Sequence, residues 1–323
     1  MAVAQPVSDW APACDGGPRA QPVSDWAPAC DAGPPRATGL CCDVTVTDND
    51  TDPVLLRSVA ERLATEAAEF VRRRRVEVFG DPLPDAGAAV RSKSTPTDPV
   101  TVVDTETERL LRDRLAELRP GDHILGEEEG GPTGGREGLT WVLDPIDGTV
   151  NFVYGLETYA VSVGVQHDGV SLAGAVANVP AGALYSAALG HGARVQRDGV
   201  TTPLRCSAAV ELSMSLVGTG FSYAPDQRAR QGEVLSRILP VVRDVRRMGS
   251  CALDLCMVAA GQLDAYYEDG VHLWDWAAGA LIATEAGASL RLPPADAQAG
   301  QIVAAAPGIA EALVDALRSS GAL

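Results

Sequence analysis

Aromatic residues and long apolar runs are scarce in this sequence. Phe, Trp and Tyr make up 5% of the 323 residues, whereas Ala, Val, Leu and Gly are abundant. This balance favours alternating strands and helices over a β-sandwich, whose strands are usually richer in aromatic residues and Thr. No apolar stretch approaches the roughly 18 residues that span a bilayer. Because the N-terminus also lacks the basic start and apolar segment of a signal peptide, we expect a cytoplasmic protein with no membrane partner.

Basic residues and metal-binding cysteine motifs are also in short supply. The chain has 26 Lys and Arg against 43 Asp and Glu, a formal net charge of −17. This charge disfavours nucleic acid, whose phosphate backbone needs a basic face, and favours cations. The seven cysteines form no CxxC pair and have no matching His cluster, so we expect reduced thiols and no zinc site.

One basic cluster, Arg72–Arg75, stands out against the acidic background. It is expected to be the solvated last turn of a helix, where the helix dipole favours positive charge. The alternative interpretation is a site for RNA or for a protein partner.

A tandem duplication occupies the start of the chain. Residues 4–19 recur almost unchanged as residues 20–36, and both copies are rich in Pro, Gly, Ala and Asp. Two Pro-interrupted copies cannot stack into a continuous core, so residues 1–49 are predicted to be a disordered tail. The folded part is expected to begin at Asp52 and Pro53, which supply an N-cap and a first helical residue.

Apolar periodicity predicts the elements that follow. The first helix is expected to bury one face, formed by Leu55, Val59, Leu63, Ala67 and Phe70. A second helix is expected from about Thr105 to Pro120, and the polar, Pro-rich segment Lys93–Asp104 before it is expected to be a mobile loop. Strands are predicted at residues 123–125, 140–143, 159–166 and 170–179, with shorter strands up to about residue 204. Beyond that point, predicted strands at 214–217, 263–267 and 302–305 alternate with helices at 227–239, 252–260, 276–286 and 308–318. The change of pattern predicts an α+β domain at residues 50–205 and an α/β domain at residues 206–323.

Two carboxylates three residues apart follow a predicted buried strand. Asp144 and Asp147 are expected to emerge where the chain turns, because Pro145 fixes its own φ and restricts the residue before it. Gly148 and Thr149 then offer backbone N–H groups to an anion. An isolated motif of this kind is also compatible with a Pro-containing turn and a solvated Asp-Gly pair.

Three further acidic segments lie at predicted element ends: Asp98–Asp104, Gly126–Glu129 and Trp274–Gly279. Taken singly, Asp104 and Asp275 could cap helices, and the three consecutive Glu residues could form a solvated loop. If carboxylates from these segments converge with Asp144, each close pair repels by roughly 4 kcal/mol at about 4 Å. Bound cations would make such a cluster tolerable.

Ligands that are all oxygen atoms suit hard cations, and a few carboxylates match Mg²⁺ better than a closed Ca²⁺ site. Two such ions can activate a water and stabilise the leaving oxygen of a phosphoryl displacement. The acidic segments therefore predict hydrolysis of a phosphate ester.

In order and spacing, these four segments resemble the inositol monophosphatase family, and the resemblance runs from about residue 52 to the C-terminus. The segments Gly249–Cys256 and Asp264–Glu268 are similar to those of its bacterial and animal inositol monophosphatases. The resemblance implies a layered αβαβα sandwich, with α+β followed by α/β structure. It also implies a Mg²⁺-dependent, lithium-sensitive phosphatase that forms a homodimer.

The resemblance implies a ligand set for two or three Mg²⁺ ions. Glu127, Asp144 and the carbonyl of Ile146 would hold a first ion, and Asp144, Asp147 and Asp275 a second. A third, weaker ion would use Glu127 and waters. Most of these ligands lie before residue 205, and the later part of the chain would complete the active site.

Further roles also follow from the resemblance. Thr149, oriented by Asp104, would position and help to deprotonate the attacking water. Gly148 and Thr149 N–H groups would bind the phosphate, and Lys93 would lie on a loop over the site. The residues expected to contact the substrate on its alcohol side are Asp147, Arg246, Cys251, Glu268 and Asp275. The chain differs from the family pattern at Glu129, which extends the usual Gly-Glu-Glu and leaves open which Glu is the ligand; we expect Glu127, because it directly follows Gly126.

The predicted function is hydrolysis of myo-inositol 1-phosphate or a related polyol phosphate. Histidinol phosphate and fructose 1,6-bisphosphate are the alternative substrates, because the metal ligands would be shared and the alcohol pocket would differ. An alternative of another class is a regulatory protein that binds a transcription-complex partner, as some bacterial relatives do.

Overall fold

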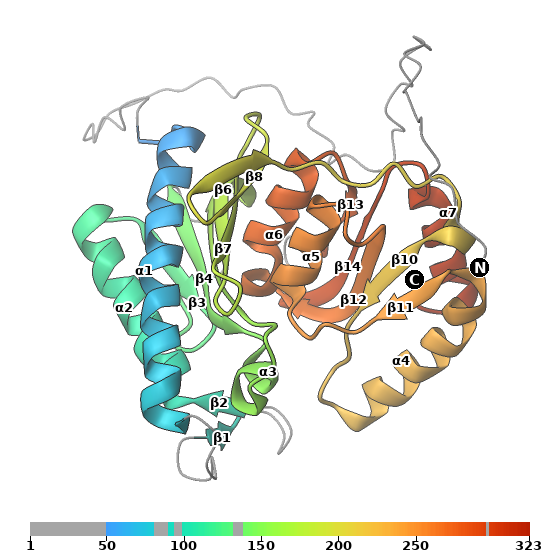
Figure 1. Ribbon diagram of the computed structural model, residues 1–323, viewed down its shortest axis with the longest axis horizontal. Coiled ribbons are helices and arrows are strands. Elements are labelled where there is room, and N and C mark those ends of the chain that lie inside the picture. The colour runs from blue at the N-terminus through green and yellow to red at the C-terminus, as the bar shows by residue number, and fades with distance from the viewer. Residues whose placement is uncertain (1–49, 81–89, 94–98, 132–137, 295–296) are drawn as a thin grey trace, which may run out of the picture. The chain divides into compact units, whose positions relative to one another are not determined.

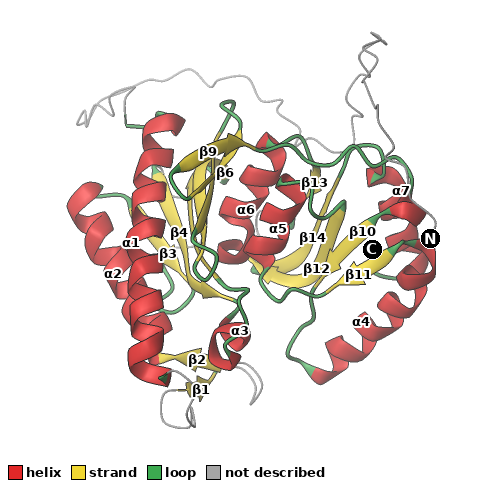
Figure 2. Cartoon of the chain, viewed as in Figure 1, coloured by secondary structure: helices red, strands yellow, loops and turns green. Residues whose placement is uncertain are grey.

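Two successive stretches of the chain each build one large sheet with its own helices (Figures 1 and 2). The structure, a computed structural model, describes residues 50–80, 90–93, 99–131, 138–294 and 297–323. The predicted tail at residues 1–49 lies outside the described residues, as does Asp98.

The first stretch forms a small hairpin and a seven-stranded sheet in the order β3-β4-β5-β6-β7-β8-β9. Its elements are α1 (Pro53–Phe79), β1 (Val90–Ser92), β2 (Pro99–Thr101), α2 (Val102–Leu118), β3 (His123–Gly126), β4 (Leu139–Asp147), α3 (Thr149–Tyr154), β5 (Ala160–His167), β6 (Val170–Asn178), β7 (Ala183–Ala188), β8 (Ala193–Arg197) and β9 (Val200–Pro203). The pairs from β4 to β9 are antiparallel, whereas β3 and β4 are parallel.

The second stretch forms a five-stranded mixed sheet in the order β11-β10-β12-β14-β13. Its elements are η1 (Leu212–Met214), β10 (Leu216–Thr219), α4 (Pro225–Ile238), η2 (Leu239–Val241), β11 (Asp244–Arg246), α5 (Cys251–Ala259), β12 (Ala265–His272), α6 (Leu273–Glu285), β13 (Ser289–Arg291), β14 (Ala299–Ala305) and α7 (Ala310–Ser320). None of the helices in the described part of the chain has the length and apolar character needed to cross a bilayer.

These elements stack in five layers. Helices α1 and α2 cover one face of the seven-stranded sheet, and α5 and α6 lie between the two sheets (Figure 1). Helices α4 and α7 cover the outer face of the five-stranded sheet. The predicted αβαβα sandwich is therefore confirmed. The predicted domain boundary at residue 205 lies, in sequence, between the segments that form the two sheets. Helix α6 comes after this boundary but packs on β5 and β6 of the first sheet.

Helix α1 begins where the sequence predicts. Asp52 caps it by accepting a hydrogen bond from Val54 N at 2.8 Å, and Pro53 is its first residue. The predicted buried face is only partly right, because Leu55 is 46% exposed. Leu63 and Ala67 are buried as predicted, and the rest of the buried stripe contains Leu56, Ala60, Ala64, Ala68 and Val71. Small side chains allow the helix to lie close to the sheet, which a ranking by hydrophobicity underestimates.

The segment that leads into α2 is more regular than predicted. Pro99–Thr101 forms β2, which pairs with β1, and the helix starts at Val102 rather than near Thr105. Thr101, not Asp104, is the N-cap, and Asp104 occupies the third helical position of a capping box. The same shift occurs in α6, which starts at Leu273 and places Asp275 at its third position.

Candidate active site

An irregularity at the end of β4 brings two carboxylates toward one cavity. Asp144 pairs with Ser162 on β5 and Asp147 with Ala160, so three steps along β4 match two along β5. A bulge of this kind changes the side-chain alternation of a strand, here between Asp144 and Asp147. Asp144 and Asp147 consequently both line the same cavity.

Asp275 joins them from α6. One carboxylate oxygen from each of Asp144, Asp147 and Asp275 lies within 4.8 Å of the others. Asp275 Oδ2 accepts a hydrogen bond from His272 N at 2.6 Å, which fixes the carboxylate at the start of the helix. Glycines in the sheet allow α6 to lie this close: a Cβ on Gly174 would be 2.8 Å from Ala278 Cα.

The cluster has the properties of a cation site. Asp144 is 2% exposed, and its Oδ1 has no hydrogen-bond partner among the described residues. Burial is the main cause that raises the pKa of Asp144 well above its usual value, and the charges of Glu127, Asp147 and Asp275 add to it. A buried oxygen without a partner beside other carboxylates is costly unless a cation binds it. The ligand set, oxygen atoms only, fits a hard divalent ion.

Asp147 is held by the N-terminus of α5. Its Oδ2 accepts hydrogen bonds from Ser250 Oγ at 2.6 Å and from Ala252 N at 2.7 Å. Burial, followed by the charge of Asp275, raises the pKa of Asp147 to about 7, although both hydrogen bonds oppose the shift. A ligand from the first stretch is thus oriented by a helix from the second.

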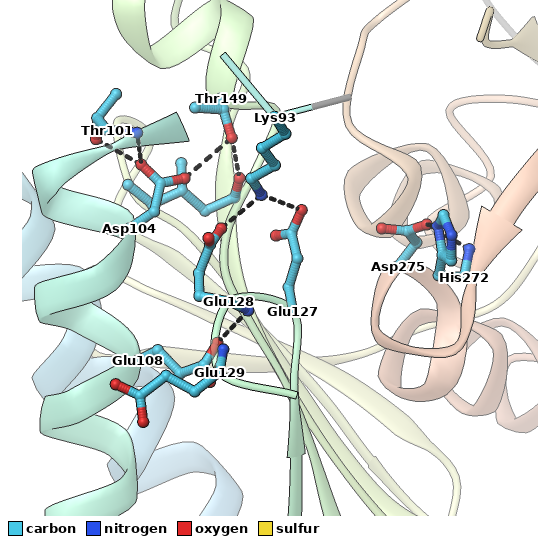
Figure 3. A network of polar contacts seen from close by, with 11 residues as sticks. Lys93, Thr101, Asp104, Glu108, Glu127, Glu128, Glu129, Thr149, His272 and Asp275 are labelled. Atoms are coloured by element: carbon cyan, nitrogen blue, oxygen red, sulfur yellow. Dashed lines mark hydrogen bonds and ion pairs between the residues drawn. The ribbon is translucent and has the colours of Figure 1, made fainter. Parts of the chain in front are cut away.

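Two of the three consecutive Glu residues share a partner, and the third has another (Figure 3). Glu127 lines the cavity and accepts a hydrogen bond from Lys93 Nζ at 2.7 Å; Glu128 also binds Lys93. Glu129 instead contacts Arg109 at 3.1 Å. Of the three, Glu127 is the one that lines the cavity, and its role as the ligand stays a prediction.

Glu127 and Lys93 shift each other's pKa. Burial raises the pKa of Glu127 to about 8, while the charge of Lys93 opposes the rise. Burial alone would lower the pKa of Lys93, but the charges and hydrogen bonds of Glu127 and Glu128 outweigh it and raise that pKa. The ammonium group therefore neutralises part of the acidic cluster.

Thr149 and Asp104 form a second polar pair at the edge of the cavity (Figure 3). Thr149 Oγ1 lies 3.1 Å from Asp104 Oδ1 and 3.0 Å from the carbonyl oxygen of Ile146. Asp104 is fully buried, and its other oxygen accepts hydrogen bonds from the backbone and hydroxyl of Thr101. Burial raises the pKa of Asp104 to about 6, against the opposing hydrogen bond of the Thr101 hydroxyl.

Gly148 turns the chain between Asp147 and Thr149. Its φ of 95° is in the left-handed region, and a Cβ would lie 3.0 Å from the carbonyl oxygens of Gly249 and Thr158. Both the conformation and the space at this position require glycine. Thr149 then starts the short helix α3.

The cavity has a volume of about 440 Å³. The predicted site residues that line it are Lys93, Glu127, Asp144, Ile146, Asp147, Gly148, Thr149, Cys251, Glu268 and Asp275. Asp104 lies behind Thr149 and is not among the lining residues. Residues that the sequence analysis did not single out also line it, among them Phe221, Tyr223, Arg247, His272 and Trp274.

Arg246 is placed differently from the other predicted contacts. Its Nη1 forms an ion pair with Asp244 Oδ2 at 2.6 Å, and it does not line the cavity, whereas its neighbour Arg247 does. Adjacent residues of an extended chain point to opposite sides, and the sequence alone does not reveal which side faces the site. Gly249 makes room for Arg247, because a Cβ there would be 2.2 Å from Arg247 Nη1.

The layered sandwich and the carboxylate cluster at the ends of β4 and α6 together define a phosphatase whose acidic residues are suited to hold metal ions. The chain belongs to the inositol monophosphatase family, whose sequence model matches residues 52–322. Proteins of this family are phosphatases, and this chain is accordingly a phosphoric monoester hydrolase.

Three relatives illustrate the membership. An inositol-1-monophosphatase of Mycobacterium leprae is 66% identical over 283 residues, which cover 85% of this chain and 97% of the relative. A Nus factor SuhB of Pasteurella multocida is 35% identical over 230 residues, 70% of this chain and 84% of that protein. The solved structure of Mycobacterium tuberculosis SuhB has 58% sequence identity and a TM-score of 0.72, and the match covers 84% of this chain and 99% of that one.

Proposed function

We propose that this phosphatase hydrolyses myo-inositol 1-phosphate, or a related polyol phosphate, and that it depends on Mg²⁺. The convergence of Asp144, Asp147 and Asp275 beside the Thr149–Asp104 pair carries the proposal. The name of the Mycobacterium leprae relative, inositol-1-monophosphatase, supports the substrate.

The ions would be held as the sequence resemblance implies. Glu127, Asp144 and the Ile146 carbonyl would bind one Mg²⁺, and Asp144, Asp147 and Asp275 a second, with a weaker third at Glu127. Bound Mg²⁺ supplies a water of lowered pKa and neutralises charge on the phosphate. Asp144 Oδ1, which has no hydrogen-bond partner in the described part of the chain, would be free to act as a ligand.

The protein groups would move the proton of the attacking water. The Thr149 hydroxyl carries one proton and can donate it to either Asp104 Oδ1 or the Ile146 carbonyl. Once the carbonyl serves as a ligand, the hydroxyl donates to Asp104, and its free lone pair can accept the proton of the water. Asp104 must be ionised for this relay. The N–H groups of Gly148 and Thr149 would bind the phosphate.

The alcohol side of the cavity favours hydroxyl groups over a second phosphate. Glu268 and Asp269 line this cavity, and although burial raises the pKa of Glu268 to about 7, negative charge on the two would repel the second phosphate of fructose 1,6-bisphosphate. The same charges would attract the ammonium group of histidinol phosphate, which makes that ester the stronger alternative. Glu268, Asp147, Asp275 and the backbone at Cys251 are proposed to contact the alcohol, and Arg247 joins them in place of Arg246.

The experiment measures phosphate release from inositol 1-phosphate, histidinol phosphate and fructose 1,6-bisphosphate, with and without Mg²⁺. Asp144→Asn and Asp275→Asn are expected to abolish Mg²⁺-dependent release. Asp168→Asn is the matched control, because Asp168 lies in the β5–β6 turn with its side chain 69% exposed and is expected to retain full activity. Full activity in either ligand variant would refute the metal assignment. Preference for another ester would change the substrate and keep the mechanism.

Lithium inhibition, homodimerisation and a cytoplasmic location stay predictions. Lithium added to the active assays, together with the molar mass in solution, tests the first two.

A regulatory role with a transcription-complex partner is the second candidate, and the Nus factor name of the Pasteurella multocida relative is what favours it. The arginine run offers it little support. Arg72 donates to the carbonyl of Val179, Arg74 pairs with Glu106, and Arg75 donates to the carbonyl of Phe152. Arg73→Ala is therefore the variant that tests this surface in a pull-down, because it removes only a contact with the Phe70 ring of the same helix, 5.6 Å from the ring centroid, and leaves the three hydrogen-bonded arginines in place. Unchanged capture of RNA polymerase components would exclude Arg73 as a contact.

A further inference from the structure

Glu108 is a buried acid that the proposed reaction does not use. It lies on α2, and its side chain is 0% exposed. Its carboxylate accepts hydrogen bonds from Glu128 N at 2.7 Å and Glu129 N at 3.0 Å (Figure 3), and from Arg112 Nε at 2.9 Å. Buried carboxylates are rare in proteins, and this one is fully paired.

The groups that bind Glu108 belong to one tight turn. Gly126 and Gly130 exchange two backbone hydrogen bonds of 3.1 Å, which close the turn between them. Arg112 Nη2 donates to the carbonyl of Gly130 at 2.5 Å. Glu108 and Arg112 therefore hold both the middle and the end of the turn against α2. Glu127 is the residue of this turn that lines the cavity.

Gly126 provides the space for this contact. A Cβ at this position would lie 2.2 Å from Glu108 Oε1 and 2.3 Å from Glu108 Cδ. Any side chain would push the buried carboxylate away from the turn. The glycine before Glu127 is thus required by Glu108, and its φ is not in the left-handed region.

The turn needs such support because it carries three consecutive carboxylates. Mutual repulsion, which Lys93 between Glu127 and Glu128 offsets only in part, would favour conformations in which Glu127 points away from Asp144. Glu108 binds the backbone N–H groups of Glu128 and Glu129. These contacts fix the path of the backbone independently of the conformations of the three Glu side chains. The turn is then already ordered before an ion binds, so the free energy of ion binding is not reduced by the cost of ordering it.

We propose that Glu108 and Arg112 are positioning residues for the metal ligand Glu127, acting through the backbone of the Gly126–Gly130 turn. The inference rests on the proposed function, in which Glu127 binds an ion. It assigns a role to two residues that touch neither the ion nor the substrate.

The test is a calorimetric Mn²⁺ titration of the full chain after metal removal. Glu108→Gln keeps the shape but turns one acceptor into an N–H₂ group that faces a backbone donor. We expect the ion that Glu127 binds to be held about 10–100-fold more weakly, as is typical when a group that orients a ligand is lost. The ion held by Asp147 and Asp275 is expected to keep its affinity, whereas a general loosening of the fold would weaken both.

Matched variants sharpen the result. Arg109→Met changes the neighbouring residue of α2, which is exposed and contacts only the Glu129 side chain in this turn, and it should leave both affinities unchanged. Arg112→Lys keeps the charge but cannot donate to both the Glu108 carboxylate and the Gly130 carbonyl. It should weaken binding of the ion at Glu127, and it provides a test if Glu108→Gln folds poorly. Gly126→Ala should reproduce the loss of affinity for the ion at Glu127. The double variant Gly126→Ala, Glu108→Ala should bind that ion no more weakly than Glu108→Ala alone.

Three outcomes separate this inference from the proposed function. Unchanged Mn²⁺ binding in both Glu108→Gln and Arg112→Lys, with tight binding by the wild type, would overturn the positioning role alone. Full additivity of Gly126→Ala and Glu108→Ala would overturn it as well. A wild-type chain that binds no Mn²⁺ would overturn the metal site itself and the proposed function with it.

Discussion

At the scale of single residues, the Thr149–Asp104 pair is the part of the site that acts on a proton. Thr149→Val and Asp104→Asn are expected to lower kcat by about 10²–10⁴, the usual contribution of a positioned general base. Mn²⁺ affinity should change little, because neither side chain is a proposed ligand. Steady-state kinetics at saturating Mg²⁺ and a metal titration measure the two quantities separately.

The pH dependence of this pair has a defined sign. Because the pKa of Asp104 is raised to about 6, kcat should fall as the pH drops through about 6 and the relay loses its acceptor. Thr202→Val, an exposed substitution on β9, is the control and should match the wild type. A Thr149→Val enzyme with wild-type kcat would contradict the relay.

The residues that line the cavity could be predicted from the sequence where the motif fixes the backbone. Gly148 could be placed there because the Asp-Gly step demands a turn, and Glu127 because it follows Gly126; their roles stay predictions. Arg247 could not, since neighbouring residues of an extended segment alternate sides and the register of β11 is set by tertiary pairing. The role of Glu108 was missed for a related reason: its partners are backbone groups 20 and 21 residues away in the chain.

At the scale of elements, the packing of α6 on the first sheet controls where Asp275 lies. Gly174→Ala would place a Cβ 2.8 Å from Ala278 Cα and 2.9 Å from Ala278 Cβ. Since backbone atoms cannot move aside cheaply, we expect α6 to shift and the chain to lose about 1–3 kcal/mol of stability. The shift should also weaken Mn²⁺ binding, because Asp275 begins the same helix.

Denaturant unfolding and the Mn²⁺ titration measure both effects of this substitution. Gly232→Ala is the matched control, since Gly232 lies inside α4 and, apart from the backbone of its own helix, no atom of the described residues would lie within 4 Å of the added Cβ. It should stabilise the chain by about 0.4–1 kcal/mol through the unfolded state and leave ion binding unchanged. Equal stability of Gly174→Ala and the wild type would refute the close-packing argument.

The elements themselves were largely predictable where their apolar period is strong, as in β5, β6 and α5. Helix starts were less predictable, because capping boxes place the acidic residue at the third position and the sequence does not distinguish this from the cap itself. The short strands β11 and β13 were missed since three residues carry no period of their own.

At the scale of the whole molecule, the site joins the two sheets. Asp144 and Asp147 come from β4 of the first sheet, and Asp275 comes from the helix that follows β12 of the second. Asn151 links the same regions, since its Nδ2 donates to the carbonyls of Thr158 at 2.6 Å and Met248 at 2.8 Å. Repulsion within the carboxylate cluster therefore acts directly on the junction between the sheets.

This arrangement predicts how the stability of the chain depends on pH and on metal. In the metal-free chain the pKa of Asp147 is raised to about 7 and that of Glu127 to about 8, mainly by burial, and both lie above the values expected in the unfolded chain. At a pH between the pKa values of the unfolded chain and those of the folded chain, the folded chain binds more protons than the unfolded chain. Its free energy of unfolding should therefore fall as the pH rises from about 4 to about 8. Mg²⁺ should reverse the loss, because it binds the ionised carboxylates and only in the folded chain.

Calorimetric Tm values at pH 5, 6.5 and 8 with and without Mg²⁺ test this prediction. The gain in Tm from Mg²⁺ should be largest at pH 8 and smallest at pH 5. Asp144→Asn removes one of the repelling charges and a ligand, so its metal-free Tm at pH 8 should exceed that of the wild type while its response to Mg²⁺ shrinks. A gain from Mg²⁺ that is independent of pH would mean that these carboxylates do not share the charge of a bound ion.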